Sequence, residues 1–197
     1  PPMDTPLRAR TVRVTDAAGY RVENVIFESR PGHAVTSNLY LPARRDRRTP
    51  AVLFLCGHEQ AGKHSLYYHQ VILRFVQAGF IVLAMDPLGQ GERLSFPEDP
   101  DGIWGTREHQ FLGAQCYMVG ENVARYFIHD AMRAVDYLCQ RLEVDPARIA
   151  VTGNSGGGTQ TAMMMVCDDR IAAAAPGTFI MNRQWYMHAG GVQDAEQ

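Results

Sequence analysis

The sequence predicts an α/β fold, with a mostly parallel sheet and helices on both faces. Three short segments are continuously apolar, residues 51–56, 80–86 and 148–153. Strands of this kind are buried on both faces, as in a parallel sheet that helices cover. Segments with helical periodicity separate them, and strand and helix alternate along the 197 residues. This alternation is typical of one α/β domain over residues 1–197.

The N-terminal part of the chain predicts antiparallel strands instead. Its three segments read TVRVTD, YRVENVIFES and HAVTSNLYLP, and each alternates apolar and polar residues. Ala18–Gly19 and Pro31–Gly32 interrupt them. Alternation with such breaks is typical of strands joined by tight turns.

Three helices are predicted around the apolar strands. Residues 65–78 carry apolar side chains and end at Gly79, which suits a helix C-cap. Residues 118–141 carry apolar side chains three or four positions apart, and residues 155–167 form the third helix. Residues 171–180 predict a further buried strand.

The stretch at about 87–116 is rich in glycine, proline and charge, and it is too long for a simple connection. We predict a cap-like insertion over the carboxyl edge of the sheet, because long loops at such places usually shape binding sites. Five aromatic residues in and beyond this stretch are candidates for lining a pocket or for ordinary packing: Trp104, Phe111, Tyr117, Trp185 and Tyr186.

Composition excludes several classes of function. The formal net charge of -2 argues against nucleic acid as a partner, because phosphate binding needs a concentrated positive face. No apolar run approaches the roughly 18 residues of a membrane span. The four cysteines show neither a CxxC pair nor metal-ligand spacing, so we expect free thiols and neither metal nor cofactor.

The run GNSGG at residues 153–157 fits the pattern G-x-S-x-G between a predicted strand and a predicted helix. In such a turn the residues two before and two after the serine crowd each other, and glycine at both places removes the clash. The turn raises the serine hydroxyl toward the N-terminus of the helix, where negative charge is favoured. We therefore interpret Ser155 as a catalytic nucleophile.

A glycine-rich turn that cradles a phosphate, with Ser155 as an N-cap, is the main alternative. A P-loop ends in lysine followed by serine or threonine, whereas Gly158 and Thr159 follow here. A dinucleotide-binding fingerprint belongs to the first strand–helix unit, whereas this turn comes late in the chain. Both differences favour the nucleophile over an anion site or packing alone.

An acyl-transfer enzyme also needs two N–H donors for the oxyanion, each worth roughly 10²–10³ in rate. The N–H of Gly156, next to the nucleophile, is the first candidate. The second comes from LFLCGHEQAGK, residues 53–63, where we choose the N–H of His58 ahead of that of Glu59. We expect the His58 side chain to order this loop rather than to act as a base.

With both loops considered, the chain resembles the α/β-hydrolase superfamily, in particular its acetyl-xylan-esterase-like and dienelactone-hydrolase-like members. The matching stretches span most of residues 51–180: AVLFLCGHEQAGK, GFIVLAMDPLGQGER, VDYLCQRLEVDPARIAVTGNSGGGTQTA and DDRIAAAAPGTFI. The resemblance implies an α/β-hydrolase fold and a serine hydrolase of carboxylic esters. It also implies a small-molecule ester substrate, such as an acetylated carbohydrate.

The chain departs from this family at its C-terminal end. In the family the triad continues after the serine with an Asp or Glu and then a His, on loops after the seventh and eighth strands. This chain ends soon after its predicted sixth strand, and His188 follows Ser155 too closely to come from an eighth. Asp168 and Asp169 are expected to be solvated loop residues. We therefore assign neither base nor acid within the 197 residues.

We expect an incomplete hydrolase fold whose partner is its own missing C-terminal segment. A serine triad without its base loses almost all of its activity, so these residues alone should be nearly inactive. The strand 171–180 would then be an unpaired apolar edge. Two other functions remain open: a catalytically silent binding or assembly module that keeps the hydrolase fold, and an enzyme that binds a phosphorylated ligand at the glycine-rich turn.

Overall fold

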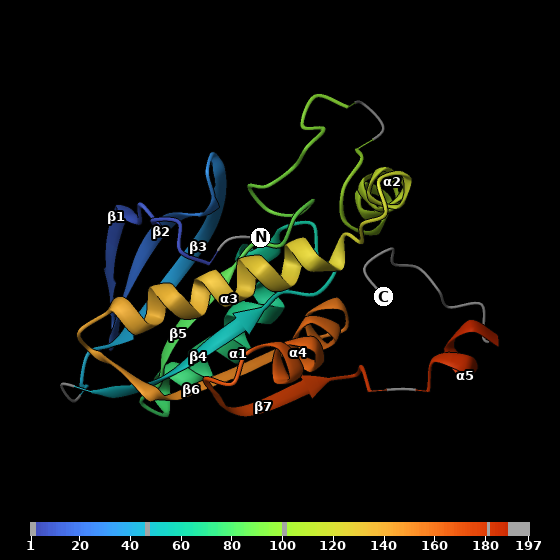
Figure 1. Cartoon of the computed structure of the whole chain (residues 1–197). Helices are drawn as coiled ribbons and strands as arrows, with labels where there is room; N and C mark the ends of the chain where they lie inside the picture. The colour runs from blue at the N-terminus through green and yellow to red at the C-terminus, as the bar shows by residue number, and fades with distance from the viewer. Residues whose placement is uncertain (1–2, 46–47, 100–101, 181, 189–197) are drawn as a thin grey trace.

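The computed structural model describes residues 3–45, 48–99, 102–180 and 182–188, which contain one seven-stranded sheet with helices on both faces (Figure 1). The strands are β1 (Arg10–Ala17), β2 (Tyr20–Arg30), β3 (His33–Pro42), β4 (Thr49–Leu55), β5 (Ile81–Met85), β6 (Val144–Asn154) and β7 (Ile171–Gly177). The helices are the short η1 (Gly62–His64), α1 (Leu66–Gln77), α2 (Gly105–Met118), α3 (Ala124–Gln140), α4 (Gly156–Cys167) and α5 (Arg183–His188). The strand order is β1-β2-β3-β5-β4-β6-β7.

The N-terminal strands form the antiparallel part of the sheet, as their alternating pattern predicts. β1 pairs with β2 and β2 with β3, and the turns between them contain Gly19 and Gly32 at positive φ of 87° and 74°. β3 then pairs antiparallel with β5, so that Asn38 lies opposite Ala84. The β2–β3 turn therefore lies at the edge where the parallel strands end.

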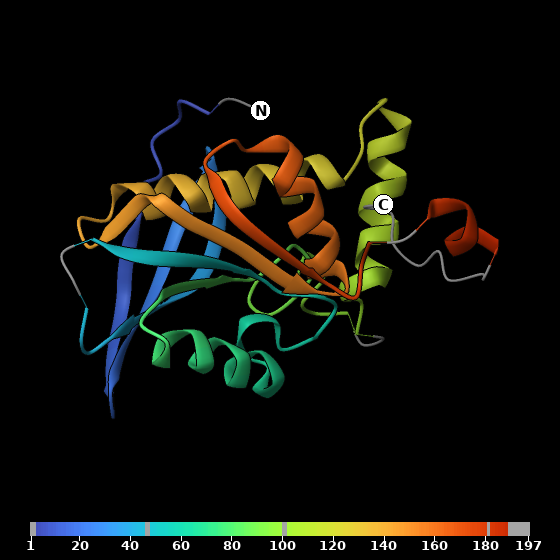
Figure 2. The same ribbon diagram turned by 90° about the horizontal axis from the view of Figure 1, so that it is seen from below.

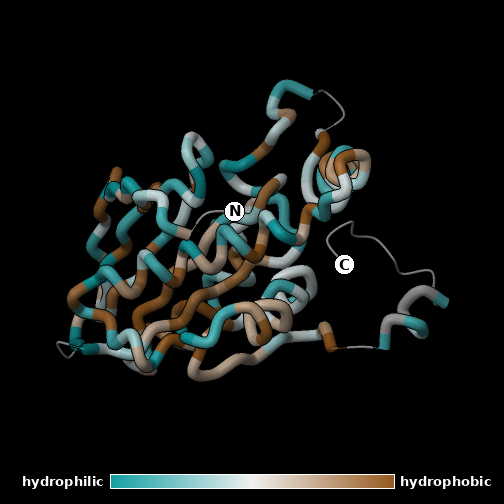
Figure 3. Tube along the Cα trace, in the orientation of Figure 1, coloured by the Kyte–Doolittle hydropathy of each residue, from teal (hydrophilic) through white to brown (hydrophobic). Residues whose placement is uncertain are grey.

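The apolar strands form the parallel part. β5, β4, β6 and β7 are neighbours in this order, and Val52 of β4 pairs with Val82 on one side and Ala150 on the other. β5 is buried throughout, and the hydrophobic colour of the tube in Figure 3 is concentrated in these central strands. The α/β fold predicted from the uninterrupted apolar runs is confirmed.

Helices pack against opposite faces of the sheet, α1 on one and α3 with α4 on the other (Figure 2). Ile72 and Val76 of α1 are buried against Val82 and its neighbours. Ala131 and Leu138 of α3 belong to the larger core on the opposite face. Burying each side chain of the size of valine or leucine stabilises the fold by roughly 1.5–3 kcal/mol.

The region between β5 and α3 differs from the prediction. The helix expected over residues 118–141 begins only at Ala124, because α2 ends at Met118 and Gly120 breaks the chain direction with φ at 74°. α2 takes up part of the predicted insertion at 87–116 and lies beyond the carboxyl ends of the parallel strands (Figures 1 and 2). Hydrophobic periodicity does not reveal α2, because its buried face is formed by Glu108, His109 and glycines.

β7 is an edge strand among the described residues, since its only partner there is β6. It was predicted to be buried, but Ala172, Ala173 and Ala175 are exposed. The tail beyond it is exposed as well, and 73% of Trp185 in α5 is accessible to solvent. The Trp185 ring contacts His188 edge-on, with the centroids 6.5 Å apart.

Candidate active site

Ser155 lies between β6 and α4 in a strained backbone conformation. Its φ is 58° and its ψ is -122°. Residues with a side chain rarely adopt this combination, and holding one there costs about 1–3 kcal/mol. The residue is exposed at the carboxyl edge of the sheet. Such strain persists where the surrounding structure imposes it, and it is concentrated at functional sites.

Two glycines make this turn possible. A Cβ on Gly153 would lie 2.3 Å from the carbonyl oxygen of Leu55 and 2.6 Å from that of Gly157. A Cβ on Gly157 would lie 2.1 Å from the same Leu55 oxygen. The two positions crowd each other and the end of β4, as the sequence pattern predicts, and neither accepts a side chain.

Hydrogen bonds tie the Ser155 backbone to the end of β7. Its N–H lies 3.1 Å from the carbonyl oxygen of Gly177 and 3.1 Å from Thr178 Oγ1. The Thr178 hydroxyl in turn donates to Asn154 Oδ1 at 2.9 Å. The last strand of the described sheet therefore helps to hold the serine in place.

The serine also opens α4. The first helical hydrogen bond runs from the N–H of Thr159 to the carbonyl oxygen of Ser155, at 2.9 Å. The N–H groups of Gly156, Gly157 and Gly158 therefore have no acceptor within the helix. With the helix dipole, these N–H groups favour negative charge beside Ser155.

The loop after β4 runs directly against this turn. A Cβ on Gly57 would lie 2.2 Å from the carbonyl oxygen of Asn154. A Cβ on Gly156 would lie 2.6 Å from Cε1 of His58. The structure thus brings His58 and Gly156 into contact. The N–H of Glu59 already donates to the Gly57 carbonyl at 2.8 Å, which favours His58 over Glu59 as the second donor.

The His58 side chain is held by a second histidine. His58 Nε2 lies 3.2 Å from Nδ1 of His109, and His109 Nε2 lies 2.7 Å from the carbonyl oxygen of Leu88. Because a carbonyl only accepts, His109 donates from Nε2 to Leu88, and His109 Nδ1 shares a hydrogen bond with His58 Nε2. These bonds support an ordering role for the His58 ring. The sequence analysis missed His109, which comes from α2.

Gln90 is a second residue that sequence reasoning missed. Its buried side-chain amide donates to the carbonyl oxygen of Gly57 at 2.6 Å and to that of Glu59 at 2.9 Å. The Gly57 carbonyl and the His58 N–H belong to one planar trans peptide, so they point in opposite directions. By holding the carbonyl, Gln90 fixes where the His58 N–H points. In the sequence, the only sign of a role for Gln90 was its place in the run DPLGQGER, residues 86–93.

A buried ion pair anchors the same loops. Asp86, at the end of β5, pairs with Lys63, and both side chains are about 1% exposed or less. Asp86 also accepts from the Lys63 N–H at 2.8 Å and from the Thr36 hydroxyl at 2.8 Å. Gly62 and Gly91 leave room for this carboxylate, since a Cβ on either would lie 2.3 Å from its Oδ1. The pair joins the loop after β4 to the loop after β5.

Burial raises the pKa of two side chains beside this loop. Burial raises the pKa of the Cys56 thiol well above its usual value, so the thiol is protonated at neutral pH. Burial also raises the pKa of Tyr68 to about 12. The Tyr68 hydroxyl would lie 2.9 Å from a Cβ on Gly57, so a protonated phenol stands beside the loop.

Among residues 3–45, 48–99, 102–180 and 182–188, no base with its acid is found beside Ser155. Among the described residues no hydrogen bond joins its hydroxyl to a histidine, and His188 lies exposed in α5. Asp168 was expected to be solvated, but it is buried and paired with Arg170. Burial raises its pKa, and the Arg170 guanidinium outweighs that and lowers it. Asp169 is exposed, as expected.

In the described part of the chain, no group of three His, Cys, Asp or Glu side chains is placed to hold a metal ion. No helix in this part of the chain has both the length and the apolar character needed to cross a membrane.

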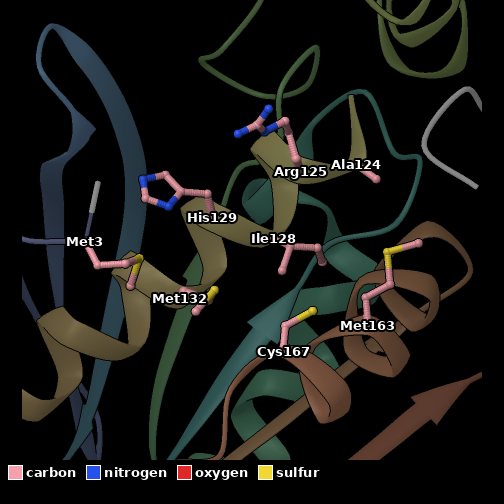
Figure 4. Close-up of a pocket in the computed structure, with 8 residues that line it drawn as sticks. All are labelled: Met3, Ala124, Arg125, Ile128, His129, Met132, Met163 and Cys167. Atoms are coloured by element: carbon pink, nitrogen blue, oxygen red, sulfur yellow. The ribbon is translucent and has the colours of Figure 1, made fainter. Parts of the chain in front are cut away.

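An apolar hollow of about 410 Å³ lies between α3 and α4, away from Ser155. Figure 4 shows the sulfur atoms of Met3, Met132, Met163 and Cys167 along it. Cys167 is exposed there, and all four cysteines are free thiols. The hollow offers no nucleophile with a base, so the candidate active site remains the turn at Ser155.

Comparison with known proteins shows the family of the chain. The sequence profile of the acetyl xylan esterase (AXE1) family matches residues 3–190. The chain belongs to this family. The matched residues include the turn at Ser155, the loop of His58 and the whole described sheet.

The individual relatives share little sequence identity with this chain. The Bacillus subtilis (strain 168) protein YtaP, described as a hydrolase, is 26% identical over 176 residues, which are 84% of this chain and 55% of YtaP. Acetyl xylan esterase 1 from Thermoanaerobacterium sp. JW/SL YS485 has a TM-score of 0.73 at 18% identity, covering 98% of this chain and 59% of that one. An acetyl xylan esterase from Paenibacillus sp. R4 has a TM-score of 0.60 at 22% identity, covering 87% and 54%.

These similarities confirm the α/β-hydrolase fold expected from the resemblance. The chain spans about half the length of the relatives it matches.

Proposed function

We propose that this AXE1 chain carries the nucleophile and the oxyanion donors of a serine esterase. The strained turn at Ser155 is the observation that supports it most, because two glycines and the end of β4 impose a conformation that stability alone disfavours. The family relationship supports a carboxylic ester as substrate, in particular a small acetyl ester or an acetylated carbohydrate.

The reaction follows from the positions of these groups. Ser155 Oγ attacks the ester carbonyl carbon while its proton passes to a base, and the carbonyl oxygen becomes negatively charged. The N–H groups of Gly156 and His58 stabilise this oxyanion. The alcohol leaves with a proton, and water then attacks the acyl-serine and releases the acid. We propose that the base and its acid come from a segment beyond the 197 residues, in keeping with the greater length of the relatives.

A fluorophosphonate probe tests this function in the whole protein. The probe should label Ser155, and Ser155→Ala should abolish both labelling and hydrolysis of 4-nitrophenyl acetate. Ser95→Ala, a change at another exposed serine near the same edge, is the matched control and should leave both intact.

The outcomes separate the candidate functions. A whole protein that is not labelled at Ser155 and hydrolyses no ester would favour the silent binding or assembly module. Loss of labelling in the presence of inorganic phosphate would favour a phosphorylated ligand at the glycine-rich turn. Hydrolysis that survives Ser155→Ala would refute the nucleophile.

A further inference from the structure

A second cavity, of about 360 Å³, lies where the ends of several segments meet at the carboxyl edge of the sheet. The end of β2, the start of β3, the loop after β5 and the helices α2 and α3 enclose it. Its polar lining includes Arg30, His33 and Gln115, and its apolar lining includes Leu88, Leu112 and Val123. We call it the Arg30 cavity. Ser155 is not among its lining residues, and its volume falls within the range of about 300–1,000 Å³ that is typical of ligand sites.

Arg30 stands out in this cavity because one of its donors is not used. Its Nε is buried and has no hydrogen-bond partner among the described residues. Its guanidinium carbon lies 4.4 Å from the ring centroid of Tyr126, which also lines the cavity. Stacking on the ring holds the guanidinium plane in one orientation. A buried donor without a partner is unfavourable, which sets Arg30 apart from the paired arginines of the fold.

The charges around Arg30 do not balance. The nearest buried carboxylate, Asp130, is engaged by Arg93 at 2.7 Å and lies 3.7 Å from Nε2 of His33. Glu108 is also buried nearby, but it does not line the cavity and accepts from a backbone N–H of the loop after β5. Arg93 therefore takes this carboxylate, and among the described residues Arg30 has no ion pair of its own. Burial also lowers the pKa of Arg30.

We propose that the Arg30 cavity binds a small organic anion, a carboxylate with an apolar body. The guanidinium carries planar pairs of N–H donors, and this geometry fits a carboxylate through two parallel hydrogen bonds. The apolar body then lies against Leu88, Leu112 and Val123. This site binds its ligand without the chemistry of Ser155, so it holds whether or not the proposed esterase function does.

Cys116 provides a direct test, because it lines the cavity and is partly exposed. The rate at which iodoacetamide alkylates each cysteine of the whole protein is measured by peptide mass spectrometry, with and without benzoate. Benzoate at ten times its Kd should slow alkylation of Cys116 roughly tenfold, because only the unoccupied fraction reacts. Cys167, exposed on the other side of α3, is the internal control and should react at an unchanged rate.

Two comparisons make the result specific. Benzamide has the same ring without the charge and should protect Cys116 far less than benzoate. Arg30→Gln should abolish the protection, whereas Arg21→Gln, an exposed arginine on the same strand, should keep it. Equal protection by benzamide, protection that survives Arg30→Gln, or equal slowing at Cys167 would each overturn the proposal. A Cys116 that resists alkylation altogether would overturn it as well, since the cavity would then be closed.

Discussion

The side-chain amide of Gln90 lies 2.6 Å from the backbone carbonyl oxygen of Gly57. This bond fixes the direction of the His58 N–H, because both groups belong to the same planar peptide. A residue on the loop after β5 thereby positions a proposed oxyanion donor on the loop after β4.

Gln90→Met should lower kcat for 4-nitrophenyl acetate about 10- to 100-fold, with little change in KM. Complete loss of one oxyanion donor costs roughly 10²–10³, and Gln90 acts only by orienting that donor. Steady-state kinetics of the whole protein measure the effect. Gln77→Met, at an exposed glutamine of α1, is the control and should leave kcat unchanged. A Gln90 variant with raised KM and normal kcat would contradict the positioning role.

Asp86→Asn should destabilise the fold by about 3–5 kcal/mol, because the buried Lys63 ammonium then keeps only the largely exposed carboxylate of Glu92 as counter-charge. The midpoint of urea unfolding measures this loss. The control is Asp16→Asn, which breaks the exposed pair with Arg21 and should cost less than about 1 kcal/mol. Equal costs for the two variants would show that Lys63 finds other partners.

Asp130 makes stability depend on pH in the acid range. Burial would raise its pKa, but the Arg93 guanidinium and His33 outweigh burial and hold the pKa of Asp130 well below its usual value. A lowered pKa in the folded state stabilises the protein fully above the unfolded pKa of about 4, and this stabilisation is lost as the pH falls toward the folded pKa.

The free energy of unfolding should therefore decrease more steeply below about pH 4 in the wild type than in Asp130→Asn. Urea unfolding at several pH values between about 2 and 6 measures both slopes. Asp4→Asn, in the exposed N-terminal segment, should keep the slope of the wild type. A parallel decrease in wild type and Asp130→Asn would contradict the role of Asp130.

Local patterns predicted most of the sheet, but they did not predict how its loops support each other. Continuous apolar runs such as 51–56 follow directly from burial on two faces, and the crowding around Gly153 and Gly157 follows from the G-x-S-x-G turn. His109 could not be predicted, because α2 buries polar residues and shows no apolar periodicity.

Gln90 could not be predicted either. A glutamine carries no sign in the sequence of which carbonyls it will bind, and its acceptors lie about thirty residues away, on another loop.

The strain at Ser155 should be measurable as lost stability. Ser155→Gly and Ser155→Ala both remove the hydroxyl, but only glycine adopts φ of 58° and ψ of -122° without steric cost. The glycine variant should therefore exceed the alanine variant in free energy of unfolding by about 1–3 kcal/mol, although glycine loses more entropy on folding. Urea unfolding of the two variants measures the difference. An alanine variant as stable as the glycine variant would contradict this prediction. The turn would then relax once the hydroxyl is gone, and the strain would depend on the serine side chain rather than on the crowding of Gly153, Gly157 and Leu55.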